Sequence, residues 1–277
     1  MLEKKDHISD EELTDLLELI YKLHGYDFRD YARASISRRV QKFLQENNFM
    51  DVAQFRERIL GDKNLFEKFL KLITVNVTEM FRDPGFYRAL KEEVLPVLAS
   101  YPIIKIWHAG CSTGEEVFSM AIVLQEAGLL KRSRIYATDI NPANIEKAKT
   151  GILPLGVLKD YTSNYIQYGG MEDFASYYTA RYDNAIIRKD IREKIIFSQH
   201  NLVTDQVFNE FQLICCRNVM IYFNRQLQNR VLRLFTDSLS TFGYLALGTK
   251  ESLLFTDVKE DFDTINLQQK IYRRIHK

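Results

Sequence analysis

The residues with the clearest chemical potential lie in a glycine-containing turn that follows an apolar run at 103–108. The segment HAGCSTGEE places Glu115 and Glu116 at the expected start of a helix. A strand, a glycine turn and a helix start let a ligand approach bare backbone at the carboxyl edge of a sheet. The segment is not G-x-G-x-x-G and lacks the lysine of a phosphate-binding loop. Two carboxylates would repel a pyrophosphate, so they favour a cationic or polyhydroxyl ligand, unless they only complement the helix dipole.

A third acid, Asp139, ends the next strand-like run, 29 residues after Gly110. In a doubly wound fold, an acid at this position commonly accepts hydrogen bonds from ribose hydroxyls. Taken alone, it is more often an N-cap, here for a helix that would start near Pro142. Together with the glycine turn, Asp139 favours a nucleoside ligand.

Two polar pairs follow later strand-like runs. His200 and Asn201 precede Leu202 after one run, and Arg217 with Asn218 follows the next. The carboxyl ends of strands are where open α/β sheets bind their ligands. Asparagine amides can meet an adenine edge or a zwitterion, although each alone could be a turn residue.

The segment NVTEMFRDP at 76–84 precedes the first strand and fits no helix face. Asn76, Thr78 and Arg82 could point polar groups into a cleft. The alternative is a capped linker between two domains.

The elements that must position these side chains change in type along the chain. In the first 75 residues, Ser9 and Glu12 form an S-x-x-E capping box before an apolar helical stripe. His24-Gly25 then supplies a helix stop. Further helices are expected at 30–46, 52–60 and 65–72.

After Pro102, short strand-like runs alternate with helical segments. This alternation predicts a doubly wound, mainly parallel α/β sheet, which a final hairpin at 262–275 closes with antiparallel strands. We therefore expect an all-α domain at 1–75 and an α/β domain at 76–277, with a small inserted β subdomain at about 164–195. Strands are expected at 103–108, 134–139, 194–199, 211–216 and 244–248, and helices at 115–127, 142–150 and 223–240.

Composition narrows the class of protein. The 277 residues include 38 Lys+Arg and 37 Asp+Glu, so the net charge of 38 − 37 = +1 argues against a nucleic-acid binder. No apolar run approaches the length of a transmembrane helix, and the charged start lacks a secretory signal, so we expect a cytoplasmic protein without membrane insertion. Cys111, Cys215 and Cys216 lie in apolar runs and suit buried thiols, and no metal site is expected.

A local basic excess lies between residues 29 and 58, where seven Lys/Arg face four acids, giving 7 − 4 = +3. Arg38 and Lys42 share a helix face, with Arg39 beside them. Such a run is usually only a solvated face.

Five ordered motifs together resemble the CheR-type chemotaxis receptor methyltransferases. They cover nearly the whole chain and read NVTEMFRDPGFY, WHAGCSTGEEVFSMAI, ATDINPANIEKAKTGI, HNL and CRNVMIYF. The resemblance implies a Rossmann-like methyltransferase domain that takes a methyl group from S-adenosylmethionine. It also implies transfer to glutamate side chains of methyl-accepting chemoreceptors for sensory adaptation, with glutamyl methyl esters and S-adenosylhomocysteine as products.

The resemblance also assigns roles to individual residues. Asn76, Thr78 and Arg82 would contact the methionine end of the cofactor, and Asp139 would bind its ribose. Arg82 and Tyr222 would line the reaction centre. The remaining expected cofactor contacts are Glu116, Asn201, Leu202, Arg217 and Asn218.

The expected substrate needs no general base. A glutamate side chain has a pKa of about 4.3, so it is already an ionised nucleophile at neutral pH. Catalysis would then come from positioning and water exclusion, with Arg82 orienting the carboxylate. The resemblance further implies a monomer whose helical domain docks on the receptor's helical bundle through Arg38, Arg39 and Lys42.

Two segments depart from the family pattern. The hairpin at 179–185 has no glycine, which disfavours tethering to a receptor tail, and Gly248-Thr249-Lys250-Glu251 replaces Gly-His-Ser-Glu. The alternatives are a non-catalytic adaptor that binds S-adenosylmethionine and the same chemistry on a non-chemotaxis protein. A nicotinamide dehydrogenase is disfavoured by the missing glycine fingerprint.

Overall fold

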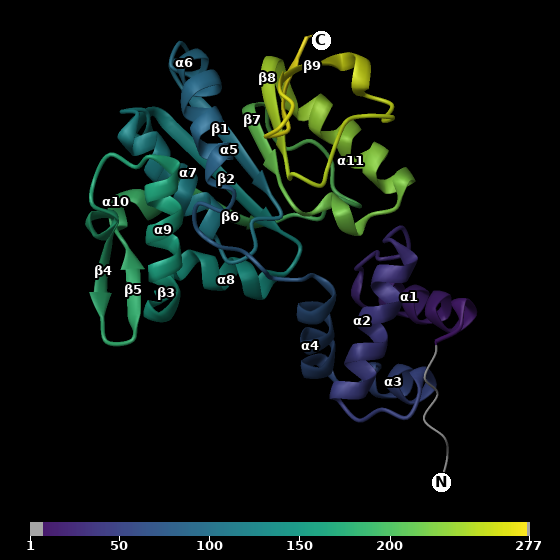
Figure 1. Cartoon of the computed structure of the whole chain (residues 1–277). Helices are drawn as coiled ribbons and strands as arrows, with labels where there is room; N and C mark the ends of the chain where they lie inside the picture. The colour runs from purple at the N-terminus through teal and green to yellow at the C-terminus, as the bar shows by residue number, and fades with distance from the viewer. Residues whose placement is uncertain (1–7, 276–277) are drawn as a thin grey trace. The chain divides into compact units, whose positions relative to one another are not determined.

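The computed structural model describes residues 8–275 and divides the chain into two compact units (Figure 1). The helical unit takes the chain up to Asn76 together with Tyr222–Arg230. The sheet unit takes Val77–Ile221 and the chain from Val231 onward. The expected boundary at residues 75 and 76 thus lies one residue before the end of the first segment, but a short later segment also joins the helical unit. No helix among residues 8–275 is long and apolar enough to cross a membrane.

The helical unit begins at the predicted capping box. Ser9 Oγ accepts from Glu12 N at 3.1 Å, and Glu12 Oε2 accepts from Ser9 N at 2.9 Å. The second helix starts at Arg33 instead of residue 30, because Ala32 N donates to Tyr222 O at 2.9 Å and so pairs with the later segment. The helices are α1 Asp10–His24, α2 Arg33–Glu46, α3 Val52–Ile59 and α4 Lys63–Ile73.

The main sheet of the sheet unit has seven strands in the order β6-β2-β1-β7-β8-β10-β9. All pairs from β6 to β8 are parallel, and the closing hairpin β9–β10 adds two antiparallel strands, which confirms the predicted doubly wound sheet. The chain winds outward from β1 to β6 and then returns beside β1, so the order reverses between β1 and β7. The strands are β1 Ile104–Ala109, β2 Ser133–Asp139, β6 Ile195–Gln199, β7 Phe211–Cys216, β8 Leu239–Leu247, β9 Phe262–Asn266 and β10 Ile271–Arg274.

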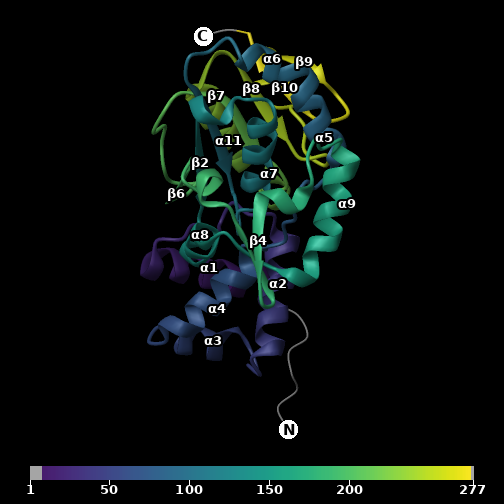
Figure 2. The same ribbon diagram turned by 90° about the vertical axis from the view of Figure 1, so that its left-hand side faces the viewer.

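Helices cover both faces of this sheet (Figures 1 and 2). On one face, Ile104 and Ile106 of β1 join the buried cluster that contains the apolar side chains of α7 and α9. On the other face, the Trp107 ring packs against Phe235 of α11, with 5.3 Å between the centroids. The helices are α5 Pro84–Ala89, η1 Leu90–Val94, α6 Leu95–Leu98, α7 Glu115–Glu126, α8 Pro142–Thr150, α9 Leu158–Tyr168, α10 Lys189–Arg192 and α11 Arg225–Ser238, and short turns are η2 Leu130–Arg132, η3 Leu155–Val157, η4 Phe174–Tyr177, η5 Met220–Tyr222 and η6 Lys259–Asp261.

A second, three-stranded antiparallel sheet, β3-β5-β4, forms the inserted subdomain. Its strands are β3 Ile152–Pro154, β4 Tyr178–Arg181 and β5 Asn184–Ile187. β3 lies outside the predicted range of about 164–195, and the start of that range is the end of α9. The buried side chains Leu158, Tyr161, Tyr165 and Tyr168 recur every three or four residues, which is a helical spacing and not a strand spacing.

A tyrosine cluster fastens α9 and the inserted subdomain to α7. Glu126, the last residue of α7, accepts hydrogen bonds from the hydroxyls of Tyr168 and Tyr177 at 3.0 Å each, and from that of Tyr165. The same carboxylate accepts from Met171 N at 3.0 Å. One side chain therefore satisfies four donors from the segment 165–177.

Candidate functional site

The carboxyl ends of β2, β1 and β7 meet beside the point where the strand order reverses. Ala109 pairs with Thr138, and His108 pairs with Cys215, so the three strands end at nearly the same level. Gly110 N and Cys111 N both donate to Thr138 O at 2.8 Å. The structure thus brings the glycine turn, Asp139 and the segment after β7 to one edge of the sheet, as the sequence predicts.

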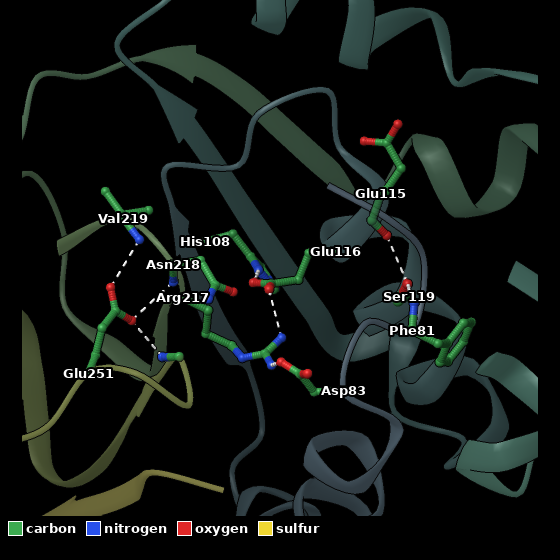
Figure 3. Close-up of polar contacts among 11 residues, drawn as sticks. Phe81, Asp83, His108, Glu115, Glu116, Ser119, Arg217, Asn218, Val219 and Glu251 are labelled. Carbon is green, nitrogen blue, oxygen red and sulfur yellow. Dashed lines mark hydrogen bonds and ion pairs between the residues drawn. The ribbon is translucent and has the colours of Figure 1, made fainter. Parts of the chain in front are cut away.

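A buried guanidinium connects this edge to the segment before α5. Arg217 Nη1 lies 2.9 Å from Glu116 Oε2, and Arg217 Nη2 lies 2.6 Å from Asp83 Oδ2. The other carboxylate oxygen of Glu116 lies 3.0 Å from His108 Nδ1 (Figure 3). The side chain of Arg217 is only 1% exposed, and its guanidinium lies 4.0 Å above the Phe86 ring. We call Asp83, Arg217, Glu116 and His108 the ion network.

The ion network changes how Glu116 and Arg217 can meet a ligand. Burial alone would raise the pKa of Glu116, but Arg217 and His108 outweigh burial and hold that pKa below its usual value. Both oxygens of Glu116 already have partners. The guanidinium of Arg217 likewise pairs with Glu116 and Asp83, so its charge is balanced within the fold.

Arg82 lies between two residues whose backbones are firmly held. Phe81 N donates to Ser119 Oγ at 2.8 Å, and Ser119 Oγ donates to Glu115 O at 2.8 Å (Figure 3). Phe81 and Asp83 have φ angles of 54° and 56°, a left-handed conformation that costs a non-glycine residue about 1–3 kcal/mol. Arg82 itself is half-buried and has no hydrogen-bond or ion-pair partner among residues 8–275. The backbone on either side of Arg82 is therefore held in place, while the Arg82 guanidinium can still bind a ligand.

Asp139 braces the glycine turn. Its Oδ2 accepts from Ser112 N at 2.8 Å, and its Oδ1 accepts from Asn141 N at 2.8 Å and from Asn144 Nδ2 at 3.1 Å. Burial raises the pKa of Asp139, against the effect of these hydrogen bonds. The N-cap of α8 is Asn141, whose Oδ1 accepts from Ala143 N at 3.0 Å, so the capping role considered for Asp139 belongs to its neighbour.

The glycine turn needs its glycines. Gly110 and Gly114 have φ angles of +78° and +97°, where other residues are strained. A Cβ at Gly110 would lie 2.5 Å from Val219 Cγ2, so the turn and the segment after β7 approach closely. Glu115 in the same turn is 6% exposed and accepts from Thr113 Oγ1 at 2.6 Å, and burial raises the pKa of its carboxyl.

The segment after β7 is also held by a carboxylate that motif reading did not assign. Glu251 is 6% exposed and accepts from Asn218 N and Val219 N at 3.0 Å each (Figure 3). The only sequence signal for it was the altered Gly-x-x-Glu segment. Asp83 and His108 were also missed as partners, because Glu116 and Arg217 are 101 positions apart and no local pattern shows that they pair.

Asn201 and Leu202 follow β6, the neighbour of β2. His200 N donates to Asp139 O at 3.2 Å, which places this segment beside Asp139. Asn201 Oδ1 accepts from Val203 N at 3.0 Å and so closes a turn, as the alternative from sequence allows. Among residues 8–275, no group of three His, Cys, Asp or Glu side chains is arranged to hold a metal ion.

The other predicted site residues divide between the units. Thr78 is half-buried in the sheet unit, whereas Asn76 and Tyr222 belong to the helical unit. Within that unit, the Arg39 guanidinium lies 4.3 Å above the Tyr222 ring, and Arg39 Nη1 donates to Ile73 O at 2.6 Å. Arg39 is half-buried, and its guanidinium already has these two partners within the helical unit.

The two basic residues beside Arg39 differ from it. Arg38 is exposed, and Lys42 is exposed with its Nζ 3.7 Å from Glu46 Oε1. An exposed pair of this kind contributes little to stability. Of the three predicted docking residues, Arg38 and Lys42 are thus the ones open to a partner.

Comparison with known proteins gives the same two-part division of the chain. Residues 76–271 match the family described as "CheR methyltransferase, SAM binding domain", and residues 11–74 match "CheR methyltransferase, all-alpha domain". A relative from Pseudomonas putida, named "Putative methyltransferase Cher3", is 48% identical over 96% of this chain and 97% of its own length. Relatives named "Chemotaxis protein methyltransferase" from Listeria innocua and Salmonella typhimurium are 31% and 30% identical, over 83% and 92% of this chain and 86% and 88% of their own lengths.

The ion network predicts a large cost for removing its central charge. Arg217→Met keeps most of the side-chain volume but leaves two acids without their partner, so we expect the free energy of unfolding of the sheet unit to fall by about 3–5 kcal/mol. The control Lys149→Met breaks an exposed pair whose side chains are 48% and 71% exposed, and should cost less than about 1 kcal/mol. Urea unfolding followed by tryptophan fluorescence measures both, and equal small losses would contradict the role given to Arg217.

Proposed function

This chain belongs to the CheR methyltransferase family and is an S-adenosylmethionine-dependent methyltransferase, and from that premise we propose that it methylates glutamate side chains of chemoreceptors. The relatives named as chemotaxis protein methyltransferases support the choice of substrate. The observation that carries the proposal is the guanidinium of Arg82, which has no hydrogen-bond or ion-pair partner among residues 8–275 and whose neighbours Phe81 and Asp83 are anchored. A guanidinium is well suited to orient a carboxylate.

The residues at the sheet edge fit the cofactor. In the turn with Gly110 and Gly114, Gly110, Ser112 and Thr113 are half-buried, and the acids that follow suit a ligand that carries an ammonium and a sulfonium group. Asp139 Oδ2 accepts one hydrogen bond from Ser112 N, which leaves acceptor capacity for a ribose hydroxyl. When bound, S-adenosylmethionine supplies a methyl group on a positively charged sulfur. The residues proposed to hold it are Asn76, Thr78, Arg82, Glu116, Asp139, Asn201, Leu202, Arg217 and Asn218.

Within that set, the ion network assigns different tasks to different residues. Glu116 and Arg217 would act mainly by fixing the turn at Phe81 to Asp83, because their charged atoms already pair with each other. Arg82 and Asn218 are proposed to meet ligands directly through their side chains, as Asp139 is for the ribose. By its place in the family motif, Tyr222 is proposed as a second residue of the reaction centre.

The proposed reaction requires the protein to position the substrate carboxylate, but not to remove a proton from it. A substrate glutamate with a pKa of about 4.3 arrives as a carboxylate. One of its oxygens bonds to the methyl carbon while the carbon–sulfur bond breaks and its electron pair stays on sulfur. The products are a glutamyl methyl ester and S-adenosylhomocysteine, and no proton moves. Arg82 would hold the second carboxylate oxygen and so leave the first free to attack.

The helical unit is proposed to dock on the receptor. Arg38 and Lys42 lie exposed on α2 and would attract an acidic helical bundle. Arg39 is not included in this surface, because its guanidinium stacks on Tyr222 and bonds to Ile73 O.

A transfer assay tests the proposed reaction. The protein is incubated with methyl-labelled S-adenosylmethionine and membranes that contain chemoreceptors. We expect label on the receptor that mild alkali releases as methanol, because a carboxyl methyl ester hydrolyses under those conditions. Receptors whose methyl-accepting glutamates are replaced by alanine provide the control. Cofactor binding without transfer to several receptor preparations would favour an adaptor, and ester formation on another protein alone would reject the chemoreceptor as substrate.

Charge reversal tests the docking surface. In Arg38→Glu/Lys42→Glu, we expect the rate of receptor methylation to fall about tenfold at low salt, and the deficit to shrink as salt screens the charges. The affinity for S-adenosylhomocysteine should not change. The matched control is Lys63→Glu/Lys68→Glu, which makes the same charge change on exposed residues of α4. If both double variants methylate receptors equally well, α2 is not the docking surface.

A further inference from the structure

The carboxylate of Glu251 lies inside a ring of backbone N–H groups. It accepts from Gly248 N at 2.6 Å, from Asn218 N and Val219 N at 3.0 Å each, and from Ile221 N at 3.3 Å. Three of these four donors belong to the segment Asn218–Ile221, which leaves the end of β7. We call this segment the β7 turn.

The β7 turn needs an external acceptor. Asn218 has a φ angle of 62°, so the chain turns sharply after β7 and its N–H groups leave the ladder of the sheet. The N–H groups at the start of the short helical turn η5 have no partner within that turn. A buried N–H without an acceptor costs free energy, and Glu251 supplies the acceptor for three of them.

The position of Glu251 is itself set by Gly248. A Cβ at Gly248 would lie 2.7 Å from Asn218 N and 2.8 Å from Glu251 Oε2, so only glycine lets the carboxylate reach the β7 turn. Thr249 and Lys250, between these two residues, are exposed. The two residues that differ from the family pattern, Thr249 and Lys250, are therefore the exposed ones. The two buried residues, Gly248 and Glu251, match the pattern and make the contact.

Two further contacts link the β7 turn to the cofactor edge. A Cβ added to Gly110 would lie only 2.5 Å from Val219 Cγ2. The β7 turn therefore packs closely on the glycine turn. The residue before it, Arg217, is fixed by Glu116 and Asp83. A shift of the β7 turn would thus move both the glycine turn and Asn218.

We propose that Glu251 is a positioning residue of the methyl-transfer site, which holds the β7 turn so that Asn218 and the glycine turn fit the cofactor. Its effect on cofactor affinity follows from the S-adenosylmethionine-binding domain alone. Its effect on turnover, through the chain that leads from the β7 turn into Tyr222, rests on the proposed function.

The test compares the buried carboxylate of Glu251 with the half-buried carboxylate of Glu126, both in the sheet unit of the full-length chain. In Glu251→Gln, one acceptor oxygen becomes an NH2 group that faces backbone donors, so we expect the dissociation constant for S-adenosylhomocysteine and the KM for S-adenosylmethionine to rise at least about tenfold. Glu126 also accepts four hydrogen bonds, but from the tyrosine cluster. Glu126→Gln should lower the melting temperature and leave cofactor affinity within about twofold of the wild type.

Two more variants separate positioning from folding. Thr249→His/Lys250→Ser should leave melting temperature and affinity unchanged, because both side chains are exposed. Gly248→Ala presses on Asn218 N and should weaken S-adenosylhomocysteine binding in the same direction as Glu251→Gln, which gives a second readout if Glu251→Gln folds poorly. Calorimetric titration with S-adenosylhomocysteine measures affinity without any receptor, so a failed receptor assay would not affect this result.

Two outcomes would overturn the proposal. One is wild-type affinity in both Glu251→Gln and Gly248→Ala. The other is an equal loss of affinity in Glu126→Gln, which would make the effect of Glu251 one of general stability.

Discussion

The guanidinium of Arg217 is the constraint on which the rest of the site depends. Its side chain is 1% exposed and pairs with Glu116 and Asp83, which come from the start of α7 and the segment before α5. A buried ion network of this kind stabilises little by itself, because desolvation offsets most of the attraction, but breaking it leaves charges without partners. The arrangement therefore acts mainly to fix one geometry. The strained backbone on either side of Arg82 can persist because this network and Ser119 hold it.

The same physical device recurs at each turn of the sheet edge. Asp139 accepts backbone and side-chain N–H groups around the glycine turn, and Glu251 accepts those of the β7 turn. Each carboxylate takes the place of the hydrogen bonds that the backbone loses where it leaves the sheet. These acids lie buried at one edge of the sheet unit, while exposed basic residues lie on α2, so the net charge of +1 conceals two regions of opposite character.

Periodicity and capping were enough to predict the helices, the doubly wound sheet and the meeting of polar strand ends. The predicted range for the inserted subdomain omits β3 and begins inside α9, whose buried tyrosines follow a helical spacing. The site was predicted as a set of residues but not as a set of contacts. The resemblance assigns Glu116 and Arg217 to the cofactor and Arg39 to the receptor, and the structure adds that each of them also has a partner inside the fold. Pairs such as Glu116 and Arg217 are 101 positions apart, so only the folded chain brings them together.

The central claim is that the site positions an ionised carboxylate and needs no general base. The pH dependence of the methylation rate, measured at saturating S-adenosylmethionine between about pH 6.5 and 8.5, tests it most directly, because a glutamate with a pKa of about 4.3 is fully ionised throughout that range. A flat profile is predicted for the chain with intact receptors. A rate that rises with pH along a single titration in that range would show that a protein group must lose a proton before transfer, and would contradict the claim.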